Sequence, residues 1–159
     1  MPSNSSFPTE PLVRGNITGR RHHDQDNGSN NIVPILSSGT PLSFWGGIDE
    51  LTGIVIDTSH PLHGKCVSGT ILVLPSGRGS FTASQVLLEL ILNDKAPKAI
   101  ILRDRDGLVC VGALIAQTVF QHENVLDILQ VNYVADFDAL IEQQPKFGSV
   151  TPDGSLLVG

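Results

Sequence analysis

The sequence predicts an α/β fold in which a small parallel sheet is joined to a β-rich N-terminal half. Two continuous apolar runs, Ile71–Leu74 and Ala99–Leu102, are typical of strands that are covered on both faces. Between these runs, apolar residues recur at helical spacing, namely Val86, Leu87, Leu90 and Ile91. Pro97 then discourages the helix from continuing. Strand, helix and strand with short connections form a parallel crossover unit.

The remaining elements are expected on both sides of this unit. Short strands are predicted at Leu12–Arg14 and Ile32–Leu36, a second helix at Val111–Phe120 and a further strand at Val125–Val131. Glycines separate short β-branched runs between residues 40 and 70, which favours several strands with bends there. Near the C-terminus, Pro-Asp-Gly at 152–154 marks a turn between two short strands.

The chain of 159 residues is the size of one domain. We expect residues 1–11 to be a flexible N-terminus and residues 12–159 to form a single domain with a polar insert at 19–31, where Asn, Ser, Asp and Gly predominate. Charged residues make up 16% of the sequence, against roughly 25% in an average soluble protein. This low charge suggests that another chain or domain covers part of the surface.

Several function classes are not expected. The formal net charge of -6 argues against nucleic acid as a partner. No apolar run is long enough to span a membrane, and the polar start has no apolar signal core, so we expect a cytoplasmic protein. Cys66 and Cys110 are expected to be reduced thiols, too few to hold an iron-sulfur cluster within this chain alone. His60 and His63 form an H-x-x-H pair without an evident third ligand, and no metal site is predicted.

The stretch "LPSGRGS", Leu74 to Ser80, is the strongest candidate site. It follows a buried strand and precedes a helix, the position where open α/β sheets present their ligands. Free backbone N–H groups at a helix N-terminus attract anions, and glycine allows an anion to approach the backbone closely. Arg78 adds a cation whose fork suits a carboxylate or phosphate. We therefore predict that Ser76, Gly77, Arg78 and Gly79 bind a small anionic substrate.

Ser80 has two interpretations from its position alone. It could cap the following helix, or it could be a reactive group. The stretch lacks the Lys-Ser/Thr ending of a Walker loop and is not the G-x-S-x-G elbow of hydrolases. If Ser80 acts as a base, its pKa must be lowered, and the helix N-terminus and Arg78 are the available means.

The segment from Pro41 to Ala116 resembles the small subunit, or swivelling domain, of aconitase X-type hydro-lyases. The resemblance rests on "PLSFWGGID", "TGIVID", "HPLHGK", "SGTILVLPSGRGS", "LLELILNDKAPKAIIL" and "GALIA" in this order. It implies a swivelling β/β/α domain that closes over an iron-sulfur cluster carried by a larger partner subunit or domain. Ser80 matches the serine that abstracts the substrate proton in that family. Gly47 is a candidate for close backbone approach to the substrate, and His60 for a substrate contact.

The family contains enzymes for more than one substrate. Cis-3-hydroxy-L-proline is favoured here over phosphomevalonate because the sequence lacks the Lys and Glu enrichment of hyperthermophiles. Two features depart from the family pattern, Phe81 after the candidate base and the insert at 19–31.

Two other functions stay open at the level of sequence. Swivelling β/β/α domains also carry phosphohistidine, which would use His60, and a non-catalytic binding module would use Ser80 only as a helix cap. Trp45 is interpreted as a core aromatic residue, with a place at a domain interface as the alternative.

Overall fold

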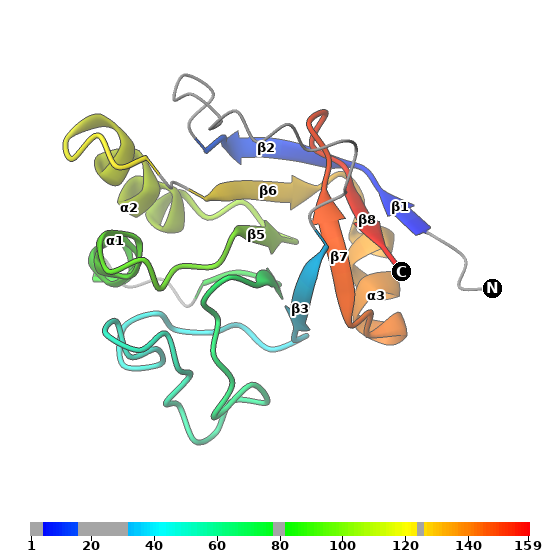
Figure 1. Ribbon diagram of the computed structural model, residues 1–159. Coiled ribbons are helices and arrows are strands. Elements are labelled where there is room, and N and C mark those ends of the chain that lie inside the picture. The colour runs from blue at the N-terminus through cyan, green and yellow to red at the C-terminus, as the bar shows by residue number, and fades with distance from the viewer. Residues whose placement is uncertain (1–4, 16–31, 78–81, 124–125) are drawn as a thin grey trace.

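One mixed sheet of eight strands runs through the protein, with α1 and α2 on one face and α3 on the other (Figure 1). The computed structural model describes residues 5–15, 32–77, 82–123 and 126–159. The sheet order is β1-β8-β7-β3-β4-β5-β6-β2. The strands are β1 (Ser5–Phe7), β2 (Thr9–Val13), β3 (Val33–Ser37), β4 (Ile71–Leu74), β5 (Ala99–Leu102), β6 (Asp127–Val131), β7 (Phe147–Val150) and β8 (Leu156–Val158). The helices are α1 (Ala83–Leu92), α2 (Gly107–Thr118) and α3 (Val134–Gln143).

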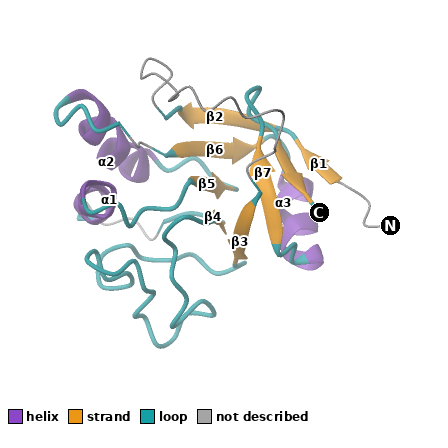
Figure 2. Cartoon of the chain, viewed as in Figure 1, coloured by secondary structure: helices purple, strands orange, loops and turns teal. Residues whose placement is uncertain are grey.

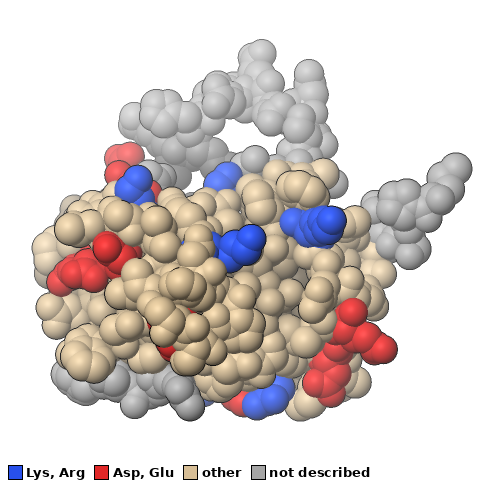
Figure 3. All heavy atoms as spheres, turned by 90° about the horizontal axis from the view of Figure 1, so that it is seen from below, with Lys and Arg blue, Asp and Glu red and all other residues tan. Residues whose placement is uncertain are grey.

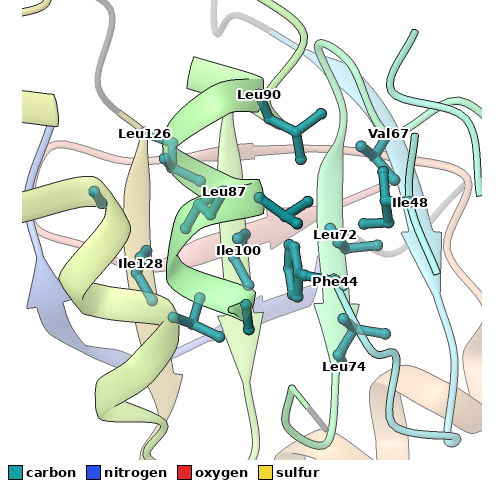
Figure 4. Packing of buried hydrophobic residues seen from close by; sticks show 14 of the residues in the cluster. Phe44, Ile48, Val67, Leu72, Leu74, Leu87, Leu90, Ile100, Leu126 and Ile128 are labelled. Atoms are coloured by element: carbon teal, nitrogen blue, oxygen red, sulfur yellow. The ribbon is translucent and has the colours of Figure 1, made fainter. Parts of the chain in front are cut away.

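The two central strands separate two hydrophobic cores. All four residues of β4 and all four of β5 are buried. Leu72 and Leu74 of β4 face the core under α1 and α2, whereas Ile71 and Val73 face the core under α3. In Figure 4, Phe44 lies among Leu72 and Leu74 and the residues of α1. Because successive side chains of a strand point to opposite faces of the sheet, β4 makes apolar contacts with the helices on both faces.

The predicted parallel crossover is confirmed. The strands expected at 71–74 and 99–102 have these bounds, and they pair in parallel with Ile71 opposite Ala99. The helix between them is α1. β3 and β6 pair in parallel with the two sides of this unit, which gives a four-stranded parallel centre (Figure 2). The turn at 152–154 joins β7 and β8, also as predicted.

The N-terminus differs from the prediction of a flexible segment over residues 1–11. Residues 5–7 form β1 antiparallel to β8, and residues 9–13 form β2 antiparallel to β6. Phe7 and Val13 are buried beneath these strands. The prediction failed because this segment holds few apolar residues, and its strand partners lie more than 100 positions away in the sequence. The insert predicted at 19–31 lies outside the described residues.

Several strands were expected between residues 40 and 70, and the structure has turns and isolated bridges there instead. The bridges join Ile48 to Val55 and Ile54 to Cys66. Gly53 and Gly64 have φ values of 74° and 79°, which interrupt extended backbone after only one or two residues. The segment packs on the α1 side of the sheet through apolar side chains, among them Leu42, Phe44 and Val67.

Two helices differ from the sequence expectation. α2 begins at Gly107, four residues before the expected start, because Asp106 caps it there. α3 was not predicted, although Phe137, Leu140 and Ile141 have helical spacing, because only two of its residues are fully buried and the signal is weak. None of the helices in the described ranges is both long and apolar enough to cross a bilayer.

α1 and α2 pack closely because Gly112 has no side chain. A Cβ atom at this position would lie 2.3 Å from the carbonyl oxygen of Ser84 and 3.2 Å from the Cβ of Leu87, both in α1. The backbone of α1 therefore occupies the space that any side chain at residue 112 would need. This contact fixes how α1 lies on the sheet, and thus where its N-terminus is presented.

We predict that Gly112→Ala lowers the free energy of unfolding by about 1 to 3 kcal/mol, because the added methyl group forces the two helices apart. The measurement is urea denaturation followed by circular dichroism. Gly107→Ala is the matched control in the same helix, since a Cβ there meets no atom within 4 Å. It should leave stability unchanged or raise it by up to about 1 kcal/mol. Equal stability of the two variants would contradict the close contact.

Candidate functional site

The predicted anion-binding turn lies at the carboxyl end of β4. Ser76 is half-buried and Gly77 is buried just after this strand, and α1 begins at Ala83. Leu42 forms an isolated parallel bridge to Gly77, which joins the segment after β3 to the loop after β4. Arg78, Gly79, Ser80 and Phe81 lie outside the described residues. The described structure therefore shows the residues on either side of the turn. The binding and catalytic roles predicted for residues 76–80 stay predictions.

Asp106 fastens the start of the turn to the neighbouring helix. Its Oδ2 accepts a hydrogen bond of 3.1 Å from the backbone N–H of Gly77. Its Oδ1 accepts hydrogen bonds from the backbone N–H groups of Leu108 and Val109, at 3.0 and 3.3 Å, and so caps α2. One carboxylate thus joins the loop after β4 to the loop after β5, and the position of the turn depends on the position of α2.

Gly77 fits this contact because it lacks a side chain. A Cβ at Gly77 would lie 2.8 Å from Oδ2 of Asp106 and 3.0 Å from Cγ2 of Val109. A larger residue would push the carboxylate away from its hydrogen bond. Sequence reasoning missed Asp106, although an Asp followed by Gly and a run of apolar residues is a recognisable N-cap signal.

The helix-cap interpretation of Ser80 can be compared with the observed start of α1. The N-cap position belongs to Thr82, whose carbonyl oxygen accepts the hydrogen bond from the N–H of Val86 at 3.2 Å. Ser80 precedes this position by two residues. A hydroxyl at residue 80 is therefore not required to define the first residue of the helix.

Gly47 lies in a tight loop that leaves no space for a side chain at this position. A Cβ at this position would lie 1.9 Å from the carbonyl oxygen of Ser43, so no side chain can be accommodated. The carbonyl oxygen of Gly47 accepts hydrogen bonds from the N–H groups of Ile56 and Asp57 at 2.8 and 3.4 Å. Its predicted approach to the substrate is not tested by this geometry.

His60 is buried, with 5% of its surface exposed. Its Nδ1 accepts a hydrogen bond of 3.1 Å from the backbone N–H of Leu62, which leaves Nε2 as the donor of the ring. Nε2 lies 3.0 Å from the carbonyl oxygen of Thr40 and donates a hydrogen bond to it. This arrangement supports the alternative in which His60 is bonded within its own turn. A substrate contact or a phosphohistidine would require one of these bonds to break.

The aromatic pair in "FWGG" has one buried and one exposed member. Phe44 is fully buried in the core, whereas 61% of Trp45 is exposed. The interpretation of Trp45 as a core residue is therefore wrong, because Phe44 already fills the core position and the next residue points outward. Trp45 borders a hollow of about 340 Å³ beside the start of α1, together with Ile56, Val86, Glu50 and Glu89.

The carboxyl end of β5 carries a second cation, but its charge is already paired. The guanidinium of Arg103 lies 2.7 Å from Oδ2 of Asp104 and above the ring of Phe137, 5.6 Å from its centroid. The hydrogen bond with Arg103 lowers the pKa of the Asp104 carboxyl, and the same bond raises the pKa of Arg103. Arg103 is therefore committed to neighbouring side chains, and Arg78 stays the candidate for binding an anion.

The two cysteines lie in different environments. Cys66 is exposed, whereas Cys110 is buried in α2, where burial raises the pKa of its thiol. Within the described ranges, no three side chains of the His, Cys, Asp or Glu type come together as metal ligands. An iron-sulfur cluster needs more thiolates than these two, so the described residues do not form a site for one.

We predict that Asp106→Ala destabilises the protein by about 1 to 3 kcal/mol and speeds hydrogen exchange at the amide of Gly77. Asp106→Ser is the informative comparison, because serine caps a helix but has no second oxygen for Gly77. It should recover about 1 kcal/mol of stability while exchange at Gly77 stays fast. Urea denaturation and hydrogen exchange by NMR measure the two effects. Wild-type exchange at Gly77 in Asp106→Ser would disprove the tether.

Known proteins resemble the chain over most of its length. The family model described as the aconitase X swivel domain matches residues 29–145. The cis-3-hydroxy-L-proline dehydratase of Hypocrea jecorina is 37% identical over 141 residues, which are 89% of this chain and 21% of that protein. The enzyme of the same name from Pseudomonas aeruginosa is 50% identical over 86 residues, which are 54% of this chain and 15% of that protein. The chain thus spans about a fifth or less of these two relatives.

A separate small subunit and a solved structure are also similar. The phosphomevalonate dehydratase small subunit of Methanothermobacter thermautotrophicus is 38% identical over 109 residues, which are 67% of this chain and 83% of that subunit. The crystal structure of Thermococcus kodakaraensis aconitase X in its holo-form superposes with a TM-score of 0.71 at 26% identity and covers 98% of both chains. The family expected from the sequence motifs is therefore confirmed, and the chain belongs to the aconitase X swivel domain family.

Proposed function

We propose that this chain is the swivelling domain of an aconitase X-type dehydratase that acts on a small hydroxy acid, with Ser80 as the base. The observation that carries the proposal is the 37% identity to a cis-3-hydroxy-L-proline dehydratase across 89% of this chain. The position of the Gly-Arg-Gly-Ser turn between a buried strand and the N-terminus of α1 supports it, because this position favours an anionic ligand.

Cis-3-hydroxy-L-proline is the substrate that we favour. The similarity to the Hypocrea jecorina enzyme extends over 89% of this chain, whereas the similarity to the Methanothermobacter small subunit extends over 67%. Phosphomevalonate is the second candidate, because this chain covers 83% of that small subunit and so has a comparable length. Both compounds carry a carboxylate, which is the group that the turn would bind.

The proposed chemistry divides between Ser80 and the residues before it. Ser76, Gly77, Arg78 and Gly79 hold the substrate carboxylate, and the tether from Asp106 to Gly77 gives this loop a fixed start. Ser80, as the alkoxide, takes the proton from the carbon next to the carboxylate. The electron pair of that C–H bond forms the new double bond as the C–O bond breaks and hydroxide leaves.

We assign the iron-sulfur cluster and the groups that assist departure of hydroxide to a larger partner subunit or domain. The described part of this chain offers no set of cluster ligands. The small-subunit name of the Methanothermobacter relative and the greater length of the two hydroxyproline enzymes support the existence of such a partner. Activity is then expected only from the assembled enzyme.

We predict that Ser80→Ala lowers kcat by about 10²-fold or more in the assembled enzyme, because the proton acceptor is lost. The assay follows turnover of cis-3-hydroxy-L-proline and of phosphomevalonate by the anaerobically reconstituted complex. Thr58→Ala, which removes a hydroxyl from an exposed turn, is the control and should keep full activity.

The outcomes test the role of Ser80 and the choice of substrate separately. Activity on phosphomevalonate alone would overturn the choice of substrate and leave the role of Ser80 standing. Full activity of Ser80→Ala would overturn that role and favour a non-catalytic serine. Binding of Ser80→Ala to the partner, measured by gel filtration, shows whether lost activity reflects lost assembly.

A further inference from the structure

The hollow beside Trp45 has the features of a docking site. We call it the Trp45 groove and define it by Trp45, Ile56 and Val86, which give it apolar walls, and by Glu50 and Glu89, which add carboxylates. It holds about 340 Å³ and runs along the first turns of α1. Trp45 and Ile56 are 61% and 47% exposed. Such exposed apolar area in a concave surface is typical of interaction sites.

The loop that carries Trp45 is held firmly. Phe44, the residue before it, is fully buried, and its carbonyl oxygen accepts a hydrogen bond of 3.3 Å from the N–H of Ile48. Gly47 accepts two backbone hydrogen bonds and has no room for a side chain. An exposed tryptophan on a loop of this kind loses little conformational freedom on binding. Tryptophans in such positions often contribute much of the binding energy of an interface.

The charge of the groove selects its occupant. No Lys, Arg or His of the described residues forms an ion pair with Glu50 or Glu89, and Oε1 of Glu89 accepts only a hydrogen bond of 3.2 Å from Nε2 of Gln85. Two carboxylates repel the carboxylate of a substrate. They attract a cation instead. The face on the side of residues 41–70 is mostly uncharged (Figure 3).

We propose that the Trp45 groove docks an arginine side chain of the larger, cluster-bearing partner. The apolar stem of arginine matches the walls, its guanidinium pairs with Glu50 and Glu89, and its flat face can stack on the indole of Trp45. The inference rests on the proposed function, because that function supplies the partner. The groove reaches Thr82 at the start of α1, which is two residues from Ser80 along the chain.

The test measures binding of this chain to the large aconitase X-type subunit, purified anaerobically with its cluster, by isothermal titration calorimetry at two salt concentrations. Trp45→Ala should raise Kd about 30-fold. The double variant Glu50→Gln with Glu89→Gln keeps the shape of the groove, and should raise Kd about fivefold to tenfold and reduce its salt dependence. Phe147→Ala, which removes another exposed aromatic residue, and Asp138→Asn with Glu142→Gln on α3 are the matched controls and should bind like wild type.

The results distinguish failure of the groove from failure of the proposed function. Unchanged Kd in Trp45→Ala, with its circular dichroism intact, overturns the docking site. If Trp45→Ala binds the partner more weakly but the double variant Glu50→Gln, Glu89→Gln binds it like wild type, the cationic occupant is overturned. At saturating partner, Trp45→Ala should regain wild-type kcat, whereas Ser80→Ala should bind normally and stay inactive. A complex that depends on Trp45 but dehydrates neither substrate contradicts the proposed function and supports the groove.

Discussion

The burial of β4 on both of its faces is the constraint on which the rest of the structure depends. Its residues alternate between the core beneath α1 and α2 and the core beneath α3. A strand covered on both sides must lie inside the sheet, and the backbone can leave it only at its ends. The loop that follows is therefore forced to the carboxyl edge, where it meets the start of α1. This one strand thus places the candidate site.

Contacts between the two neighbouring strand-and-helix units hold the loops at the carboxyl edge of the sheet in place. The loop after β4 carries the turn, and the loop after β5 carries Asp106, which bonds to both Gly77 and the N-terminus of α2. Gly112 brings α2 against α1, so the two helices and the tether form one connected support. The described residues on either side of the turn are therefore both held, Gly77 by the Asp106 carboxylate and Thr82 by the start of α1.

The two sites proposed near the start of α1 have opposite character. The turn is proposed to bind an anion through its backbone N–H groups and Arg78, whereas the lining of the Trp45 groove includes two carboxylates and apolar side chains. In this proposal the turn and the groove do not compete for one ligand. The cationic turn repels the cation that the groove attracts, and the acidic groove repels the anion that the turn attracts. The proposed function needs both sites, since a domain with that function must hold a substrate and also meet its partner in one orientation. The low charge of the sequence agrees with a surface that is partly covered in the assembled enzyme.

The sequence by itself determined the central crossover, the position of the Gly-Arg-Gly-Ser turn and the family. These features are local, because apolar periodicity and turn residues within a few positions specify them. The N-terminal strands, the bond from Asp106 to Gly77 and the exposure of Trp45 beside a buried Phe44 were decided only by the tertiary structure. Each depends on contacts between residues that are distant in sequence, or on which of two adjacent residues has its side chain in the core. Long-range pairing and packing leave no periodic signal in the segments that they bring together, so only the folded chain reveals them.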